Sequence, residues 1–385
     1  MLLIQNAKVV TMEDKDYLDG GEILIDNGRI VAVGYGLPRN GAETVDACGC
    51  YALPGVIDAH CHVGMWEDAM GFEGNDGNEV TDPITPQLRA IDGVNPQDRC
   101  FDEALTAGVT TVATGPGSAN VIGGQFVLLK TGVGPLDARI VAEPLALKIA
   151  FGENPKRVYS EKKRSPSTRM ASIALLRQAL VDAREYGKKR EAADADKRPS
   201  RDLGKEILLR ALIGELTVKA HAHRADDILS ALRVAREFGL NMSLEHCTEG
   251  YLIADQLREA QCAAMLPVIV GPLLSDRSKI ELRNLSFFAP AKLHLAGVRF
   301  AMMTDHPVIP LQYLSVCAAI AFREGLPERE ALRSITLNAA WAVGYDAELG
   351  SLAPGKVADL ALYDAHPLDT RAHVTEVYLG GERVK

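Results

Sequence analysis

The 385-residue sequence lacks the features that mark a membrane or a secreted protein. No uninterrupted apolar run approaches the roughly 20 residues that a transmembrane helix requires. The opening stretch, MLLIQNAKVVTMEDKD, soon turns acidic and has neither the basic start nor the small-residue cleavage site of a signal peptide. We therefore expect a cytoplasmic protein without a membrane partner.

An excess of positive charge is also absent. Lys and Arg number 42 against 51 Asp and Glu, which gives a formal net charge of −9 and argues against a nucleic-acid partner. Seven cysteines, an odd number, make a poor disulfide framework. Cys48 and Cys50 are a close pair, but no second pair completes a zinc site around them. The remaining composition, 47% hydrophobic and 24% charged, is that of an ordinary globular chain.

Strand-like apolar runs alternate with helix-like segments through the middle of the chain. LTVKAHAH, for example, is followed by the amphipathic ADDILSALRVAREFG. Repeated strand–helix units predict a parallel sheet, and the length suits a closed barrel of roughly 250 residues with an accessory domain. We predict an α/β fold whose residues 53–346 form a (β/α)8 TIM barrel.

Both ends of the chain are rich in strand signals instead. The first part contains a hairpin signal at Asp26–Gly28, and the last part contains the runs KVADLALYD and VTEVYLGGERVK. We predict that residues 1–52 and 347–385 meet in one small β-sandwich domain.

Histidines gather in a few short motifs. In LPGVIDAHCHVG, His60 and His62 are two residues apart, so an extended strand directs both imidazoles to one side, together with Asp58. Such a pair suits a metal ion better than core packing.

Further polar residues stand at or near predicted strand ends. They are Lys219, His221 and His223 in VKAHAHRADD, His246 in LEHCTEG, and Asp305 and His306 in MMTDHP. Since the carboxyl ends of barrel strands meet at one face, these side chains should converge on one site. Their nitrogen and oxygen atoms suit Zn²⁺ or a similar divalent ion, which lowers the pKa of bound water from about 16 towards 7. A neighbouring carboxylate can then pass the proton to a leaving nitrogen.

The ordered series LPGVIDAHCHVG, GVTTV, HAH, EHC, TDHP, TLNAAWAVG and GSLAPGKVADLALYD resembles the metal-dependent amidohydrolase superfamily. The likeness is closest to the branch of imidazolonepropionase and the prolidase-like hydrolases, and it extends over nearly the whole chain. It implies a (β/α)8 barrel with a β-sandwich from both chain ends. It also implies hydrolysis of an amide-type C–N bond, linear or cyclic, in a small-molecule substrate.

The resemblance also implies the site residues. The metal ligands that it implies are His60, His62, His221, His246 and Asp305, and Asp305 is also the catalytic proton shuttle. His223 lies further towards the mouth of the barrel and is expected to contact substrate, whereas the role of His306 stays open.

Lys148, in LALKIAFGENPK, decides between one metal ion and two. It resembles the carbamylated lysine that bridges two ions in the binuclear branch. The alternatives are a lysine that extends to solvent from a barrel end or one that binds an anionic substrate. Lys219 is a weaker candidate, and without a bridging lysine the site is mononuclear. Zinc is the first expectation, although His and Asp ligands also suit other divalent ions.

Two rival functions remain. One is a deaminase of the same superfamily, although HAHRADD offers Arg224, Asp226 and Asp227 where many deaminases carry a glutamate. The other is a non-catalytic scaffold that kept the fold. Self-association into a homo-oligomer also stays open. Lys156, Arg157 and Arg169, in the segment after Lys148, can supply cations for a substrate carboxylate or form a solvated loop.

Overall fold

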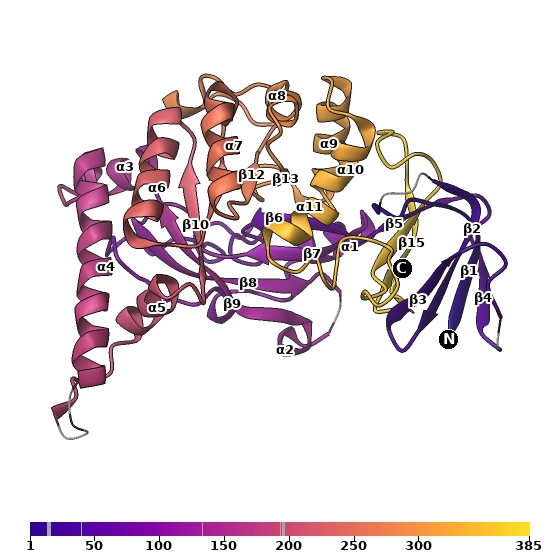
Figure 1. Ribbon diagram of the computed structural model, residues 1–385, viewed down its shortest axis with the longest axis horizontal. Helices are drawn as coiled ribbons and strands as arrows, with labels where there is room; N and C mark the ends of the chain where they lie inside the picture. Colours follow the sequence, from indigo (N-terminus) through magenta and orange to yellow (C-terminus); the bar gives the residue numbers. More distant parts are fainter. Residues whose placement is uncertain (14–16, 40, 133, 193, 195–196) are drawn as a thin grey trace.

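The computed structural model describes residues 1–13, 17–39, 41–132, 134–192, 194 and 197–385. Two eight-stranded sheets account for its strands, and helices surround the larger sheet (Figure 1). Within the described ranges, no helix combines the length and the apolar character needed to cross a membrane.

The larger sheet is a nearly closed barrel. Its strands, in the order in which they pair, are β6 (Val56–Cys61), β7 (Val109–Thr114), β8 (Ile122–Lys130), β9 (Ile140–Ala150), β10 (Thr217–Ala222), β11 (Met242–His246), β12 (Val268–Val270) and β13 (Phe300–Met302). Backbone hydrogen bonds join the segments after the two outer strands: His62 N donates to His306 O at 2.9 Å, and Asp305 N donates to His60 O at 3.3 Å. The predicted α/β barrel is therefore confirmed.

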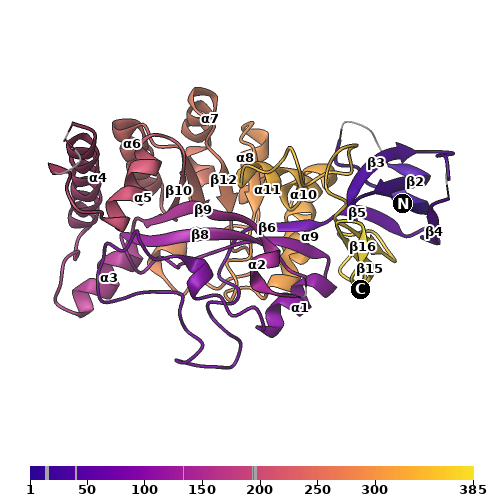
Figure 2. The same cartoon turned by 90° about the horizontal axis from the view of Figure 1, so that it is seen from below.

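One strand departs from the all-parallel arrangement that strand–helix alternation predicts. β8 pairs antiparallel with both β7 and β9, whereas the other neighbouring strands pair in parallel. Only residues 115–121 connect β7 to β8, and a parallel connection needs a crossover of about a dozen residues or more. The glycine-rich segment from Gly115 to Val127 thus forms a short buried connection followed by the first part of β8, and the two strands β8 and β9 run side by side (Figure 2).

Helices follow most barrel strands and cover the outside of the sheet. The α-helices are α1 (Arg99–Thr106), α2 (Leu136–Arg139), α3 (Glu153–Glu161), α4 (Arg169–Ala192), α5 (Leu203–Leu212), α6 (Ala225–Phe238), α7 (Ala254–Ala263), α8 (Ala289–Leu295), α9 (Leu314–Arg323), α10 (Glu328–Ser334) and α11 (Leu337–Ala342). Short 3₁₀ turns are η1 (Ala90–Asp92), η3 (Gly250–Ile253), η4 (Ile280–Leu282) and η5 (Leu311–Tyr313).

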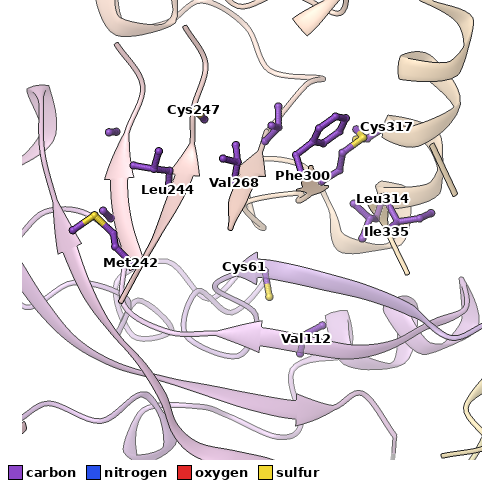
Figure 3. Packing of buried hydrophobic residues seen from close by; sticks show 14 of the residues in the cluster. Cys61, Val112, Met242, Leu244, Cys247, Val268, Phe300, Leu314, Cys317 and Ile335 are labelled. Carbon is purple, nitrogen blue, oxygen red and sulfur yellow. The ribbon is translucent and has the colours of Figure 1, made fainter. Parts of the chain in front are cut away.

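Alternate residues of the barrel strands serve two cores. Leu244 of β11, Val268 of β12 and Phe300 of β13 belong to the outer core, where Phe300 lies beside Cys317 of α9 (Figure 3). Neighbouring positions on the same strands, such as Ile269, belong to a second apolar cluster with α11. This alternation leaves the carboxyl ends of the strands for polar side chains.

The smaller sheet contains strands from both ends of the chain, and both termini lie on it (Figure 1). Its strands are β1 (Leu2–Val9), β2 (Leu18–Asp26), β3 (Arg29–Gly34), β4 (Glu43–Asp46), β5 (Tyr51–Pro54), β14 (Leu360–Tyr363), β15 (Val374–Leu379) and β16 (Glu382–Arg383). Ile4 and Ile23 share an apolar cluster with Leu360 and Tyr378, so the two ends bury a common core. The two ends meet as expected, while the boundaries at residues 52 and 347 stay predictions.

Gly55 separates the two sheets, since β5 belongs to the smaller one and β6 to the barrel. Its backbone N–H donates to Asp359 O at 2.9 Å. A Cβ atom at this position would lie 2.1 Å from Oγ1 of Thr110, closer than van der Waals contact allows. The close approach of the Thr110 side chain to this backbone therefore requires a glycine.

Replacing this glycine tests the junction. We expect Gly55→Ala to lower the free energy of unfolding by about 1–3 kcal/mol, because overpacking displaces Thr110 or the strand. Thermal denaturation at a matched scan rate measures the effect. Gly34→Ala is the control, because its Cβ would meet nothing closer than Leu37 Cδ2 at 3.9 Å. Equal melting temperatures for the two variants would contradict the argument.

Candidate metal centre

Polar side chains from four strand ends, those of β6, β10, β11 and β13, come together at the carboxyl face of the barrel. Two groups of candidate metal ligands lie there, and within each group the candidate ligand atoms are within 4.8 Å of one another. The first group is His60, His62 and Asp305, and the second is His221, His223 and His246. The ring centroids of His60 and His246, one from each group, are 5.6 Å apart.

In the first group, Asp305 faces both histidines of the HxH motif. Its Oδ1 lies 3.2 Å from His62 Nε2 and 3.8 Å from His60 Nε2. His62 Nδ1 lies 2.7 Å from the carbonyl oxygen of Gly115, so this nitrogen carries the proton as a donor. The lone pair of His62 then remains on Nε2, which points to the aspartate.

In the second group, the three rings pack closely. The centroid of His246 is 4.3 Å from that of His221 and 4.3 Å from that of His223. His246 Nδ1 donates to Gly271 O at 3.1 Å, and His223 Nδ1 lies 2.7 Å from the hydroxyl of Thr248.

Several ring nitrogens of this second group are buried without a hydrogen-bond partner in the described part of the chain. They are Nδ1 and Nε2 of His221 and Nε2 of His223. Leaving a buried polar atom unpaired costs roughly 1–3 kcal/mol, so such atoms call for a partner. Neutral imidazole nitrogens are good ligands for a divalent cation, and the donor set therefore fits one.

Burial also sets the protonation of these rings. It lowers the pKa of His60, His223 and His246 well below the ordinary histidine value. The pKa of His221 is lowered for the same reason. Neutral rings with free lone pairs are the form in which histidine binds metal.

Lys148 on β9 reaches between the two groups. Its side chain is 1% exposed, and Nζ lies 3.0 Å from His60 Nε2. Burial lowers the pKa of Lys148 to about 8. The negative charges of Glu245 and Asp305 raise this pKa, but burial outweighs them. A substantial neutral fraction of this amine therefore exists near neutral pH, unlike that of a surface lysine.

Glu245 on β11 is a buried residue that the sequence analysis did not single out. Its Oε2 lies 2.9 Å from His60 Nδ1, and its Oε1 lies 3.1 Å from Nζ of Lys219 and also accepts from the hydroxyl of Ser243. Glu245 thus lies next to His60 Nδ1 without a hydrogen bond of normal geometry between them, and His60 Nε2 remains for the site. Nζ of Lys219 contacts Glu245 and also donates to Ala59 O at 3.1 Å. With both contacts in place, Lys219 does not bridge the two groups.

Asp58 does not join the cluster, although its position two residues before His60 suggested that it would. One carboxylate oxygen accepts from His60 N at 3.0 Å, and the other accepts from Thr304 N at 3.0 Å. The pairing register of β6 shifts between Asp58 and Cys61, which breaks the simple alternation of faces. Asp58 therefore links β6 to the segment after β13, and its burial raises its pKa to about 7.

Backbone strain accompanies the site. His246 has φ 72° and Asp305 has φ 55°, in the left-handed region that non-glycine residues rarely adopt. Such conformations cost of order 1–3 kcal/mol each and cluster at functional sites, which supports a functional role for this face.

A second missed residue is Glu281, in η4 after β12. Its Oε1 lies 3.7 Å from His223 Nε2 and 3.9 Å from His221 Nε2. Burial raises the pKa of Glu281, but contact with His221 and the charges of His223 and Lys279 outweigh burial and leave this pKa below its ordinary value. The surrounding sequence, SDRSKIEL, carries no motif that would have revealed it.

Glu281 also forms the inner wall of a pocket of about 410 Å³. The rest of its lining includes the cations Lys156, Arg157, Arg169 and Arg224 and the acids Glu153 and Glu161. Arg169 binds Asp227 through two hydrogen bonds of 2.8 and 3.0 Å, and Arg224 binds Asp226. The pocket therefore carries both charge signs, and through Glu281 it adjoins the second histidine group.

His306 lies apart from both groups. It is 3% exposed and neighbours Asp98 and Cys100, with which it forms a further set of candidate ligand atoms within 4.8 Å of one another.

Comparison with known proteins agrees with this architecture. The sequence profile of the Amidohydrolase family matches residues 51–384. A solved structure, the amidohydrolase from Thermotoga maritima MSB8, is 43% identical to this chain and superposes on it with a TM-score of 0.96. The match covers 100% of both chains.

Two curated relatives show how far the similarity reaches. Amidohydrolase tasK of Hapsidospora irregularis is 30% identical over 98% of this chain, but the chain spans only 42% of that longer protein. Imidazolonepropionase of Acidiphilium cryptum is 26% identical over 95% of this chain and 94% of the relative.

The role of Glu245 can be tested by removing its charge. We expect Glu245→Gln to weaken zinc affinity about 10- to 100-fold, since a partner that orients a ligating histidine typically contributes this much. Competition with a fluorescent chelator measures the affinity. The matched control is Glu259→Gln on the exposed face of α7, which should bind like the unmodified chain. An unchanged affinity in a folded Glu245→Gln protein would contradict the positioning role.

Proposed function

The chain belongs to the amidohydrolase family, and we propose that it is a metal-dependent hydrolase that cleaves an amide-type C–N bond, linear or cyclic, in a small-molecule substrate. The observation that carries this proposal is the arrangement of His60, His62 and Asp305 in one group beside a second that holds His221 and His246. Together these side chains form the donor set that a hydrolytic divalent ion, zinc first, requires.

Each of the two adjoining groups would hold a divalent ion. His60, His62 and Asp305 would hold one, and His221 and His246 the other. A divalent ion supplies Lewis-acid polarisation of the scissile carbonyl and lowers the pKa of water.

Asp305 is proposed as the proton shuttle. It accepts the proton of the attacking water at a carboxylate oxygen and passes it to the leaving nitrogen. Burial raises the pKa of this carboxyl, but its contact with His62 and the positive charge of Lys148 outweigh burial and leave the pKa below its ordinary value. An ionised carboxylate at this point is ready to act as a base.

Lys148 is proposed to join the two groups as a carbamate. Carbamylation requires a neutral amine, and burial lowers the pKa of Lys148 to about 8. Its Nζ is already 3.0 Å from the His60 nitrogen that faces the site. Addition of CO₂ to the neutral amine would form an N–C bond and release one proton to solvent, and the resulting anionic carbamate would supply oxygen ligands for divalent ions.

The pocket beside Glu281 is proposed to receive the substrate. Its volume of about 410 Å³ suits a small molecule, and His223 and Glu281 would contact the end near the scissile bond. Lys156 and Arg157 line its outer part, where they favour a substrate that carries a carboxylate. N-acylated amino acids and dipeptides combine both features.

The structure offers little to a deaminase. That reaction needs a proton donor near the carbon that is attacked, yet Arg224 and Asp226 pair with each other at 2.9 Å. Glu281 lies nearby, but its lowered pKa keeps it ionised at neutral pH. A scaffold without activity is disfavoured because each of the polar side chains expected at the site is present.

Metal content tests the bridging lysine. We expect Lys148→Ala, purified without chelator, to hold at least one divalent ion per chain fewer than the unmodified protein, because the bridging ligand is removed. Elemental analysis measures the ratio. Lys188→Ala, an exposed site on α4 paired with Glu185, is the control and should keep the full metal content. Equal metal content in Lys148→Ala and the unmodified chain would remove Lys148 from the centre.

Activity tests the reaction. We expect the metal-loaded enzyme to release free amino acid from a panel of N-acylated amino acids and dipeptides. Asp305→Asn should lower kcat by about 10²- to 10⁴-fold, because the amide cannot take the proton. Chromatographic product analysis and an ammonia assay on the same reactions separate amide hydrolysis from deamination. Ammonia release from amidines, without carboxylate product, would overturn the proposal in favour of a deaminase.

A further inference from the structure

A third cluster of ligating side chains lies behind the catalytic face, between the start of α1 and the segment that follows β13. It consists of Asp98, Cys100 and His306, which are 5%, 4% and 3% exposed. One ligand atom from each lies within 4.8 Å of the other two. Ligand atoms around a tetrahedral zinc ion lie about 3.3–3.8 Å apart at bond lengths of roughly 2.0–2.3 Å, so modest side-chain movement brings the three into range.

The imidazole of His306 has no partner of its own. Neither Nδ1 nor Nε2 has a hydrogen-bond partner within the described part of the chain, and both are buried. A buried ring with two unpaired nitrogens is costly, and a cation beside Asp98 and Cys100 would satisfy one of them.

Asp98 is already fixed in place by the start of the helix. Its Oδ1 accepts from Cys100 N at 3.1 Å, and its Oδ2 accepts from Gly64 N at 3.1 Å. Each carboxylate oxygen has two lone-pair directions, so both keep the capacity to bind a cation. The nearby carboxylates of Asp68 and Glu103 add negative charge around His306.

The cluster differs from the catalytic groups in its chemistry. Neither catalytic group contains a sulfur ligand, whereas Cys100 supplies one here. Cys61, which stands between His60 and His62, is packed in the apolar core and is no ligand of either. A combination of Asp, Cys and His selects zinc or another thiophilic divalent ion over magnesium or calcium.

We propose that Asp98, Cys100 and His306 form a second cation site, selective for Zn²⁺ or a similar thiophilic ion and distinct from the catalytic centre. On binding, the thiol of Cys100 releases its proton to solvent and its sulfur bonds to the ion, without change of oxidation state. The site adjoins the catalytic groups through the backbone, because His306 follows Asp305 directly and His306 O accepts from His62 N at 2.9 Å. A bound ion therefore immobilises the segment that carries Asp305.

Cobalt spectroscopy on the full chain separates this site from the catalytic one. Metal-free protein is titrated with Co²⁺, and the near-ultraviolet thiolate-to-cobalt charge-transfer band is recorded with the visible bands. We expect the charge-transfer band, once all sites are filled, to reach the intensity of one cobalt–thiolate bond per chain, and to be lost in Cys100→Ser while the visible bands of the histidine site remain. No charge-transfer band in the unmodified chain, or a band that persists in folded Cys100→Ser, would overturn the proposal.

Two further variants complete the test. Cys48→Ser/Cys50→Ser removes the close pair of thiols near the surface and should keep the band; loss of the band there would assign it to that pair and overturn the proposal. His221→Ala removes a residue of the catalytic centre and should keep the charge-transfer band while changing the visible bands. Retention in His221→Ala supports the second site even if the proposed hydrolase fails, and loss of the band in folded His221→Ala overturns its independence.

Discussion

The buried carboxylate of Glu245 is the contact on which the metal centre depends. It lies against the ammonium of Lys219 on one side and the ring of His60 on the other, and it is fully buried. Removing one member of a buried charge pair costs roughly 3–5 kcal/mol, because the other charge is left in a poorly polarisable surrounding. This arrangement joins β6, β10 and β11 at the level where the histidines emerge. The imidazoles can stay neutral and close together because the charges of Lys219 and Glu245 beside them compensate each other.

Much of the centre could be predicted from the sequence, because the side-chain period of a strand and the position of strand ends are local properties. His60, His62 and Asp305 lie together and His221 lies in the adjoining group, near the strand ends where the pattern placed them, while their roles as ligands stay predictions. Glu245 could not be found in this way. It precedes His246, and strict alternation would place the two on opposite faces, yet the left-handed backbone at His246 turns both towards the interior. No residue type in the motif predicts the left-handed conformation at His246.

In the fold, too, some features follow from local sequence patterns and others do not. Strand–helix alternation predicts the barrel, and strand signals at both ends predict the composite sheet. The reversed direction of β8 depends on a connection of a few residues, whose shortness is evident only once both strand boundaries are known. Glu281 and the pocket beside it depend on segments after β12 and β9 that carry neither a periodic pattern nor a motif. Tertiary position, rather than local pattern, decides their roles.

The composite sheet also has a consequence for synthesis. One edge of β5 pairs with β14, which enters the chain about 300 residues later. At 5–20 residues per second, translation leaves that edge without its partner for roughly 15–60 s. An unpaired strand edge is a template for association with other chains. The barrel can begin to fold on the ribosome during this interval, whereas the smaller sheet must be completed after it, so a chaperone that shields β5 would act at a defined stage of synthesis.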